Sequence, residues 1–278
     1  MTDPYREIAE WYDLEHDALT DDLECYLELL SKPAGGSGTG AESHRTSVLE
    51  VGSGTGRIAA ALAAAGFDVT GVEPSPAMRE RAQVRLTQLP PRVARRIHVV
   101  SGAADDYGED VPADLRFHAI LYGLNTFAHL TDYRARTRAL AAARSHLEEN
   151  GLLLIDVDLA GPRRLLASAG QLQLQGSWMI PPESGQWVSH LVSGALGPEP
   201  GTLIVTHWYD VFRSGQPVVR TQTQMPMALM SRGELELAVA SAGFETLAVY
   251  GGFDLAPVDD LSARAILLAS LPKDAPAG

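Results

Sequence analysis

Short apolar segments that alternate with helical segments constrain the fold of this 278-residue chain more than any other feature of its sequence. Helical patterns end near residues 65, 89 and 147 and separate these apolar segments. Five segments have the length and character of buried strands, and they cover residues 48–51, 68–72, 97–100, 117–122 and 152–157. Strands that alternate with helices of this length predict an α/β fold with a doubly wound, mainly parallel sheet.

The segments before and after these five strands have a different pattern of apolar and turn-forming residues. Residues 5–31 carry apolar side chains at helical spacing, and a glycine- and serine-rich stretch follows them. Four strand-like runs separated by short turns rich in proline and glycine occupy the region after the fifth strand, which favours an antiparallel arrangement. We therefore predict a helical lid over residues 1–33, a flexible linker over 34–45 and a core over 46–170 and 230–278. An antiparallel β insert is predicted over residues 171–229, and it covers a substrate or makes a dimer contact.

Composition and charge exclude several classes of partner. Aspartate and glutamate number 35 against 22 lysines and arginines, so the net charge of −13 argues against binding to nucleic acid or to an anionic membrane surface. The single cysteine, Cys25, excludes an intrachain disulfide and a multi-cysteine metal site. The polar start is unlike a signal peptide, and no apolar run reaches the roughly 18 residues of a membrane helix. We expect a cytoplasmic protein without a metal that acts on a small molecule.

The loop after the first predicted strand is the most informative motif. Its glycines, Gly52, Gly54 and Gly56, permit a tight turn and a close approach of the backbone to a ligand. The helix that follows points its free N–H groups at that ligand. A dinucleotide site has the spacing Gly-x-Gly-x-x-Gly, whereas this loop has Gly-x-Gly-x-Gly with Glu50 just upstream. A carboxylate there would repel a pyrophosphate and would suit an ammonium group.

A second carboxylate, Glu73, ends the second predicted strand, 17 residues after Gly56 (73 − 56 = 17). A parallel α/β site places the carboxylate that accepts both ribose hydroxyls near this position. The two features together predict a nucleoside ligand that carries an amine.

An ordered set of motifs resembles the class I S-adenosylmethionine-dependent methyltransferases, in particular their small-molecule branch, which includes sugar amine N-methyltransferases. The resemblance covers residues 48–157 and, more weakly, 232–271. The motifs that carry it lie at residues 11–16, 48–57, 71–78 and 147–151. The resemblance implies a Rossmann-like fold and S-adenosyl-L-methionine as the cofactor.

The same resemblance implies roles for single residues. The backbone of Gly52 and Gly54 is expected to face the methionine part of the cofactor, and Met78 to pack near the adenine. Ala103 stands where the family often has an adenine-contacting aspartate, so either Asp105 or the backbone alone makes this contact. The full set of expected cofactor-binding residues is Tyr12, Glu50, Gly52, Ser53, Gly54, Gly56, Arg57, Glu73, Pro74, Ser75, Met78, Ala103, Ala104, Asp105, Tyr122 and Leu124.

The candidates for the chemistry lie after the fourth predicted strand and on the insert. His129 is the predicted general base, because an imidazole accepts a proton near neutral pH; the alternative is a histidine that only hydrogen-bonds within its loop. The predicted substrate-binding residues are Asn125, Trp178, His207 and Tyr209. Strict alternation puts His207 and Tyr209 on one face of a strand, and His190 lies on the strand before it. That face covers the substrate, packs on its own apolar side or forms a homodimer contact.

These inferences predict transfer of a methyl group from S-adenosyl-L-methionine to N or O of a small molecule by in-line displacement. Holding the acceptor in line supplies much of the acceleration of such a reaction. Two alternatives stay open at this point, an NAD-dependent oxidoreductase and a non-catalytic nucleoside-binding protein of the same fold. The glycine spacing and Glu50 disfavour the first.

Overall fold

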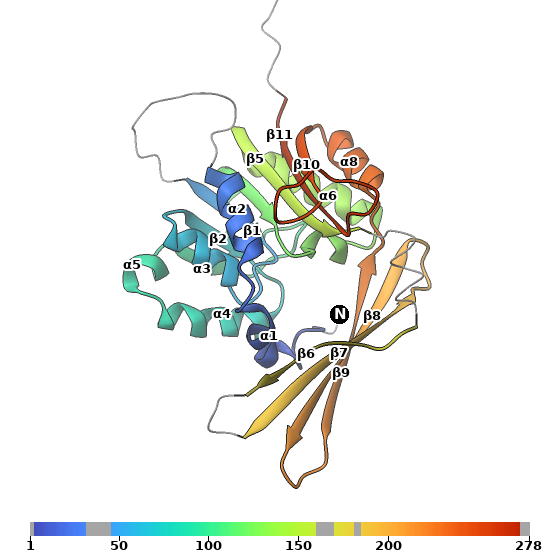
Figure 1. Ribbon diagram of the computed structural model, residues 1–278. Helices are drawn as coiled ribbons and strands as arrows, with labels where there is room; N and C mark the ends of the chain where they lie inside the picture. Colours follow the sequence, from blue (N-terminus) through green and yellow to red (C-terminus); the bar gives the residue numbers. More distant parts are fainter. Residues whose placement is uncertain (1–2, 32–45, 160–169, 181–184, 273–278) are drawn as a thin grey trace, which may run out of the picture.

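The computed structural model describes residues 3–31, 46–159, 170–180 and 185–272. The predicted linker over residues 34–45 lies outside the described residues. The strands form two separate sheets, one of seven strands and one of four (Figure 1). The helices are α1 (Ala9–His16), α2 (Asp21–Ser31), α3 (Arg57–Ala64), α4 (Pro76–Gln88), α5 (Pro91–Ala94), α6 (Tyr133–His146), α8 (Arg232–Ser241) and the short 3-10 helix η1 (Thr126–His129).

The seven-stranded sheet has the order β10-β11-β5-β4-β1-β2-β3. Its strands are β1 (Ser47–Val51), β2 (Asp68–Val72), β3 (Ile97–Val100), β4 (Phe117–Tyr122), β5 (Leu147–Asp158), β10 (Glu245–Tyr250) and β11 (Arg264–Ser270). The first five strands pair in parallel, and β11 runs antiparallel to both of its neighbours. The prediction of a mainly parallel sheet is therefore confirmed.

The order of the strands reverses at β1, which pairs with β2 on one side and with β4 on the other. Open α/β sheets bind ligands outside the carboxyl ends of their strands at such a reversal. The glycine loop follows β1 there, and the segment that leads to η1 follows β4 at the same edge. The topology therefore brings the two segments that the sequence singled out to one place.

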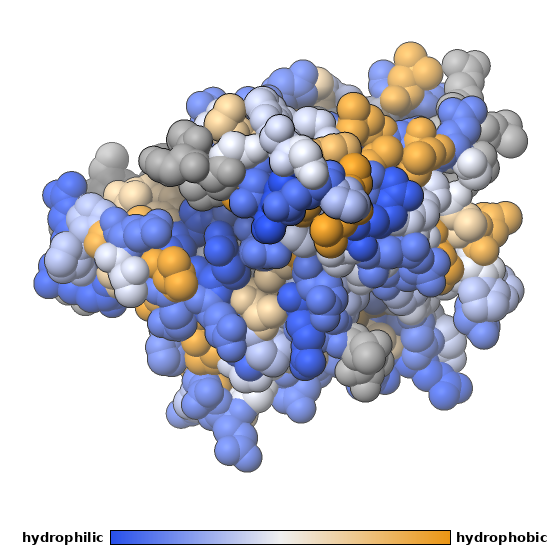
Figure 2. Space-filling view, turned by 90° about the horizontal axis from the view of Figure 1, so that it is seen from below, coloured by the Kyte–Doolittle hydropathy of each residue, from blue (hydrophilic) through white to orange (hydrophobic). Residues whose placement is uncertain are grey.

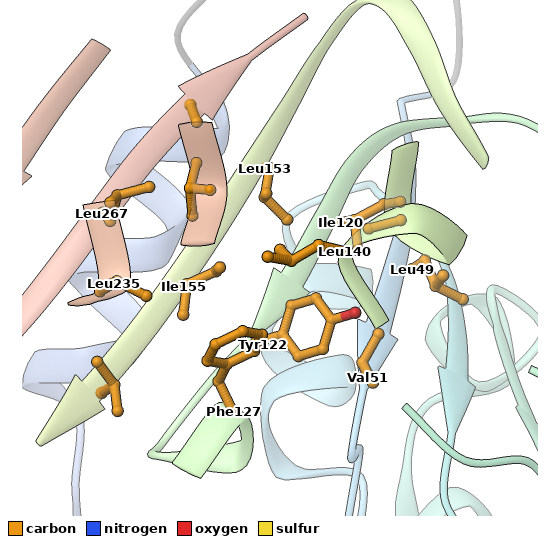
Figure 3. Packing of buried hydrophobic residues seen from close by; sticks show 14 of the residues in the cluster. Leu49, Val51, Ile120, Tyr122, Phe127, Leu140, Leu153, Ile155, Leu235 and Leu267 are labelled. Carbon is orange, nitrogen blue, oxygen red and sulfur yellow. The ribbon is translucent and has the colours of Figure 1, made fainter. Parts of the chain in front are cut away.

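Alternating side chains of the strands fill two cores, one on each face of this sheet. Leu49 and Val51 pack with residues of α6 and α8, whereas Val48 packs with residues of α2 and α3 on the other face. Figure 3 shows part of the first core, where the rings of Tyr122 and Phe127 meet edge to face with their centroids 5.5 Å apart. Burial of each such large side chain contributes about 1.5–3 kcal/mol, so both faces of the sheet anchor the loops at its edge.

The N-terminal segment, predicted to be helical over residues 5–31, forms the two helices α1 and α2. The chain turns between α1 and α2, and the carbonyl of Leu19 in this turn accepts a hydrogen bond from Nη1 of Arg57 at 2.8 Å. The same guanidinium forms a buried ion pair with Asp22 in the first turn of α2. These contacts satisfy polar groups at the break, and local periodicity does not reveal them because Arg57 lies on α3.

The four strands of the predicted insert form an antiparallel sheet in the order β6-β7-β8-β9. They are β6 (Gln173–Met179), β7 (Gln186–Leu196), β8 (Thr202–Arg213) and β9 (Val219–Ala228). Helix α1 lies between this sheet and the seven-stranded sheet (Figure 1), and its Trp11 stacks on Tyr209 with ring centroids 5.3 Å apart. Seen from below, the surface is mostly hydrophilic, with hydrophobic groups in separate patches (Figure 2).

Candidate functional site

The glycine loop after β1 has a backbone that only glycine adopts without strain. Gly52, Gly54 and Gly56 have φ angles of 70°, 55° and 77°. A Cβ at Gly52 would lie 2.5 Å from the side chain of Thr126 in η1, so the loop also passes close to the segment after β4. The amides of Gly52 and Ser53 both donate to the carbonyl of Val72, at 2.8 and 3.1 Å, which ties the loop to the end of β2.

Glu73 follows β2 and holds the turn of the glycine loop. Its Oε2 accepts a hydrogen bond from the amide of Gly54 at 2.9 Å, and its Oε1 accepts one from the amide of Ser75 at 2.8 Å. The residue is 5% exposed. Burial raises the pKa of the carboxyl, and the two backbone hydrogen bonds oppose this rise. Each carboxylate oxygen accepts more than one hydrogen bond, so Glu73 retains lone pairs for a ligand's hydroxyl groups.

The first turn of α4 also contacts the glycine loop and the N-terminal segment. Ser75 caps the helix, because its Oγ accepts from the amide of Met78 at 3.2 Å, and the same hydroxyl donates to Asp3 at 2.7 Å. Met78 is buried, and its terminal methyl would lie 3.6 Å from a Cβ placed at Gly54. The carbonyl of Pro74 accepts from Arg79 at 2.9 Å. The structure thus brings the first two sequence motifs into direct contact.

Two buried polar atoms beside the glycine loop have no hydrogen-bond partner within the described ranges, Oε2 of Glu50 and Oγ of Ser53. Glu50 is 2% exposed. Burial raises the pKa of its carboxyl to about 8, with an opposing effect of Arg57 and a further rise from Glu73. Buried polar atoms in native proteins almost always have partners, so these two atoms mark a place for a polar ligand.

Arg57 directs its side chain away from the glycine loop, toward the N-terminal helices. Its guanidinium contacts only the turn at Leu19 and the carboxylate of Asp22 among the hydrogen bonds of the described residues. Both charged partners of this ion pair are buried, with 7% and 1% of their side chains exposed. Arg57 therefore fixes the N-terminal helices to α3.

The third predicted motif lies after β3. Ala103 and Asp106 form an isolated antiparallel bridge, with a hydrogen bond of 2.7 Å from the amide of Ala103. The carboxylate of Asp105 accepts two hydrogen bonds from Arg138 of α6, at 2.7 and 2.9 Å. The carbonyl of Ala104 lies 3.5 Å from the hydroxyl of Tyr122. The side chain of Asp105 is thus bound to α6, and the backbone of Ala103 and Ala104 forms the turn.

Two consecutive residues after β4, Leu124 and Asn125, have left-handed backbones with φ angles of 43° and 68°. This conformation is costly for residues other than glycine. Asp156 at the end of β5 compensates for it: Oδ2 accepts from the amide of Leu124 at 3.1 Å, and the backbone carbonyl accepts from the amide of Asn125 at 3.0 Å. The side-chain oxygen of Asn125 accepts from the amide of Asp158 at 3.0 Å. These bonds fix the loop to β5.

Asp156 is itself fully buried and is held by two further side chains. The hydroxyl of Tyr26 in α2 donates to it, and Nη1 of Arg264 in β11 lies 2.5 Å from its Oδ1. Burial raises the pKa of Asp156, while Arg264 and Tyr26 oppose the rise. The sequence gives no signal for Tyr26 or Arg264 as partners of Asp156. The three residues lie on α2, β11 and β5, and no local pattern connects these elements.

His129 ends η1 and faces the N-terminal segment. Its Nε2 lies 3.0 Å from the hydroxyl of Tyr5, and burial lowers the pKa of the imidazole. Tyr12 lies nearby, with its ring stacked on His16 at a centroid distance of 3.9 Å. Burial is the largest of the effects that raise the pKa of Tyr5, so this phenol keeps its proton at neutral pH. Tyr5 was not among the predicted site residues.

The second sheet presents a group of aromatic rings to α1. His190 stacks on Tyr209 with centroids 4.2 Å apart, and its Nε2 lies 2.9 Å from Nδ1 of His207. Trp178 is half-buried and packs against the cluster that contains Tyr209. The structure therefore brings together the predicted residues His207, Tyr209 and Trp178. Asn125 lies on the loop after β4 instead, with its side chain bonded to β5.

The part of the chain that the structure describes contains no group of three or more histidine, cysteine, aspartate or glutamate side chains arranged to bind a metal ion. Within the same part, no helix is long and apolar enough to cross a membrane.

Comparisons with known proteins find methyltransferases both by sequence and by fold. Residues 49–153 match a family model described as "Methyltransferase domain". An uncharacterized methyltransferase from Bacillus licheniformis is 61% identical over 41 residues, which are 15% of this chain and 19% of that protein. The aligned segment thus spans about a fifth of that relative's length.

Solved structures resemble almost the whole chain. The CcbJ methyltransferase from Streptomyces caelestis has 22% identity and a TM-score of 0.78, with 98% of this chain and 99% of that chain covered. The sugar N-methyltransferase KedS8 from Streptoalloteichus sp. has 21% identity and a TM-score of 0.70, with 98% and 96% covered. CalS10 from Micromonospora echinaspora, an amino pentose methyltransferase with S-adenosylmethionine bound, has 18% identity and a TM-score of 0.66, with 98% of each chain covered.

These findings confirm the predicted fold class and the predicted resemblance, and they give no support to the NAD-dependent oxidoreductase. Residues 49–153 therefore match the methyltransferase-domain family, and the chain has the Rossmann-like fold of the solved S-adenosylmethionine-dependent methyltransferases.

Proposed function

We propose that this chain transfers the methyl group of S-adenosyl-L-methionine to the amine nitrogen of a small molecule. The observation that carries the proposal is the pair of carboxylates, Glu50 and Glu73, buried beside the glycine loop. A pyrophosphate would place its negative charge against both carboxylates. An adenosine that carries an amino acid offers ribose hydroxyls to Glu73 and an ammonium group to the unpaired oxygen of Glu50.

The residues present fit this cofactor, which when bound supplies a methyl group on a positively charged sulfur. Glu73 would accept the ribose hydroxyls, and Met78 would pack against the adenine. Asp105 is committed to Arg138, so the backbone of Ala103 and Ala104 is better suited to the adenine contact than the Asp105 carboxylate. Backbone carbonyl groups after β4 would accept further hydrogen bonds from the ammonium group beside Glu50, whereas the amide of Leu124 is already bonded to Asp156.

We propose that the acceptor lies between the glycine loop, the N-terminal segment and the second sheet. His129 with Tyr5 faces this space from the edge of the seven-stranded sheet, and His207 and Tyr209 face α1 from the insert. In this proposal the N-terminal helices and the strands β6–β9 act as the lid and the substrate cover. The role of His129 as a general base stays a prediction.

Nitrogen is favoured over oxygen as the atom that accepts the methyl group for two reasons. KedS8 is described as a sugar N-methyltransferase and CalS10 as an amino pentose methyltransferase. In addition, burial lowers the pKa of His129 and His207, so both rings are neutral near pH 7. A neutral imidazole accepts a proton from an ammonium group more readily than from an alcohol, which is a far weaker acid. Amino sugars are therefore the first class of acceptor to test.

The experiment incubates the purified chain with S-adenosyl-L-methionine and a panel of amino sugars, each paired with the analogue in which a hydroxyl replaces the amine. Mass spectrometry then measures a gain of one methyl group together with S-adenosylhomocysteine. We expect methylation of at least one amine and of none of the hydroxyl analogues. Binding of the cofactor without methylation of any compound in a broad acceptor panel would indicate a non-catalytic protein and overturn the proposal.

A homodimer contact through the second sheet is a further part of the proposal. Large apolar side chains of this sheet are exposed, among them Leu196 and Val219. Light scattering that gives the mass of one chain at all concentrations tested would exclude this contact.

A further inference from the structure

Three titratable side chains form a line from α1 into the second sheet. Nδ1 of His190 lies 2.8 Å from Oε2 of Glu15, and Nε2 of His190 lies 2.9 Å from Nδ1 of His207. The ring of Tyr209 stacks on His190 within 5° of parallel, and its hydroxyl donates to the same Glu15 oxygen at 3.4 Å. His190 is 4% exposed, so packing and hydrogen bonds hold this line in one arrangement.

The carboxylate at one end determines which nitrogen atoms carry protons. Burial alone would raise the pKa of Glu15, but the contact with His190 outweighs it and the pKa is lowered. Nδ1 of His190 lies 2.8 Å from the ionised Glu15, which favours a proton on that nitrogen, although the contact does not have the geometry of a regular hydrogen bond. With its proton on Nδ1, Nε2 of His190 is an acceptor in the 2.9 Å contact with His207, and His207 then donates from its own Nδ1. The Nε2 of His207 is left with a free lone pair.

This lone pair has no hydrogen-bond donor among residues 3–31, 46–159, 170–180 and 185–272. His207 lies at the site, because it pairs with Thr223 of β9, whose hydroxyl donates to the carbonyl of Pro4 at 2.8 Å. The next residue along the chain from Pro4 is Tyr5, which binds His129. His129 and His207 are close enough to interact electrostatically.

The two histidines differ in one respect that matters for proton transfer. The Nε2 of His129 is engaged by the hydroxyl of Tyr5, whereas the Nε2 of His207 has no hydrogen-bond partner within the part of the chain that the structure describes. Burial, together with His190 and His129, lowers the pKa of His207 to about 4, so the ring is neutral at physiological pH. Glu15 is the opposing influence and favours a positive charge on His207 once a proton arrives.

We infer that His207 is the proton acceptor for the amine that becomes methylated, and that Glu15 and His190 are positioning residues that keep its Nε2 free. The inference rests on the proposed function. In the reaction the amine nitrogen forms a bond to the methyl carbon, the bond from that carbon to sulfur breaks, and its electron pair stays on sulfur. The nitrogen then releases a proton to Nε2 of His207. A shift of the Nδ1 proton to His190 places the positive charge beside Glu15, in the manner of a base oriented by a carboxylate.

The first test measures the protonation of the imidazoles and does not depend on activity. Long-range proton–nitrogen NMR spectra of the full chain at pH 7, assigned with single histidine variants, report which ring nitrogen of each histidine carries hydrogen. We expect the Nδ1–H form for both His190 and His207. In Glu15→Gln we expect a mixture of forms at His207. A proton on Nε2 of His207 in the wild-type chain would overturn the inference.

The second test is kinetic and uses whichever amine the wild-type chain methylates. We expect His207→Gln to lower kcat about 100-fold or more, within the range of general base catalysis, with the Kd for S-adenosylhomocysteine within twofold of the wild-type value. Glu15→Gln is expected to lower kcat about 10-fold. His98→Gln is the matched control, because His98 is exposed on β3, the edge strand of the other sheet. A wild-type kcat in His207→Gln would overturn the inference.

The two tests also separate this inference from a purely structural role and from the proposed function. If Glu15 only fastens α1 to the second sheet, Glu15→Gln lowers the melting temperature but leaves kcat and the His207 tautomer of the folded chain unchanged, and the inference is overturned. A wild-type chain that methylates no amine counts against the proposed function, and the NMR result then decides the inference alone.

Discussion

The backbone amide of Gly54 lies 2.9 Å from Oε2 of Glu73, so a hydrogen bond joins two motifs that are 19 residues apart in the chain. The same carboxylate is bonded through Oε1 to Ser75 at the start of α4. Glu73 thus fixes the shape of the glycine loop while its remaining lone pairs face the proposed ribose site. A change at Glu73 is therefore expected to affect both the loop and the ligand.

Replacement of this carboxylate is the first prediction. Glu73→Ala removes the acceptor for the ribose hydroxyls, and hydrogen bonds to charged groups contribute about 1.5–3 kcal/mol each. We expect the Kd for S-adenosyl-L-methionine, measured by calorimetry, to rise about 100-fold or more. Glu80→Ala is the control, because Glu80 is an exposed glutamate on α4, the helix that follows Glu73. A Kd within twofold of the wild-type value in Glu73→Ala would contradict the ribose assignment.

The second prediction concerns the protons that accompany cofactor binding. The pKa of Glu50 in the free protein is raised to about 8, so the carboxyl is largely protonated at pH 7. An ammonium group beside it would lower this pKa, so binding releases a proton and the affinity rises as the pH increases toward 8. Calorimetry at pH 7 in two buffers of different ionisation enthalpy should show release of about one proton. In Glu50→Gln this release should disappear; its persistence would show that another group titrates.

The third prediction tests the ion pair between Arg57 and Asp22. Removal of one partner leaves the other as an unpaired buried charge, which costs about 3–5 kcal/mol. We expect Arg57→Met to lower the free energy of unfolding in denaturant titrations by about this amount. The double variant Arg57→Met/Asp22→Leu removes both charges and should recover most of the loss. Equal stability of the single variant and the wild type would show that the pair does not hold the N-terminal helices.

The sequence predicted the strands, most helices and the glycine loop with its two carboxylates, because these features depend on local periodicity and on spacing within one βαβ unit. It did not predict η1, the break between α1 and α2, or the role of Asp156. Each of these depends on contacts between distant segments: Arg57 satisfies the carbonyl of Leu19, and Asp156 holds the left-handed residues Leu124 and Asn125.

The acceptor side was the least predictable part of the site for the same reason. Alternation placed His207 and Tyr209 on one face, but the partners of that face come from the N-terminal segment, about 190 residues earlier in the chain. Glu15 and Tyr5 carry no local signal for their contacts with His190 and His129. Only the folded chain shows that these residues meet.

The fourth prediction concerns Asp156, which connects α2, β5 and β11 with the loop after β4. Asp156→Ala leaves Arg264 without its buried partner and removes the acceptor for the amide of Leu124. We expect the free energy of unfolding to fall by about 3–5 kcal/mol and the affinity for S-adenosyl-L-methionine to fall with it, because the loop loses its fixed shape. Asp110→Ala, at an exposed position, is the control. Unchanged stability of Asp156→Ala would contradict this role.

The central claim is that the loop from Gly52 to Gly56, with Glu50 and Glu73, binds an adenosine that carries an amino acid. Isothermal titration of the wild-type chain with S-adenosyl-L-methionine, S-adenosylhomocysteine and NAD tests it most directly. We expect saturable binding of both adenosyl amino acids at micromolar concentrations, and no binding of NAD in the same range. Binding of NAD alone, or no binding of either adenosyl amino acid at millimolar concentration, would contradict it.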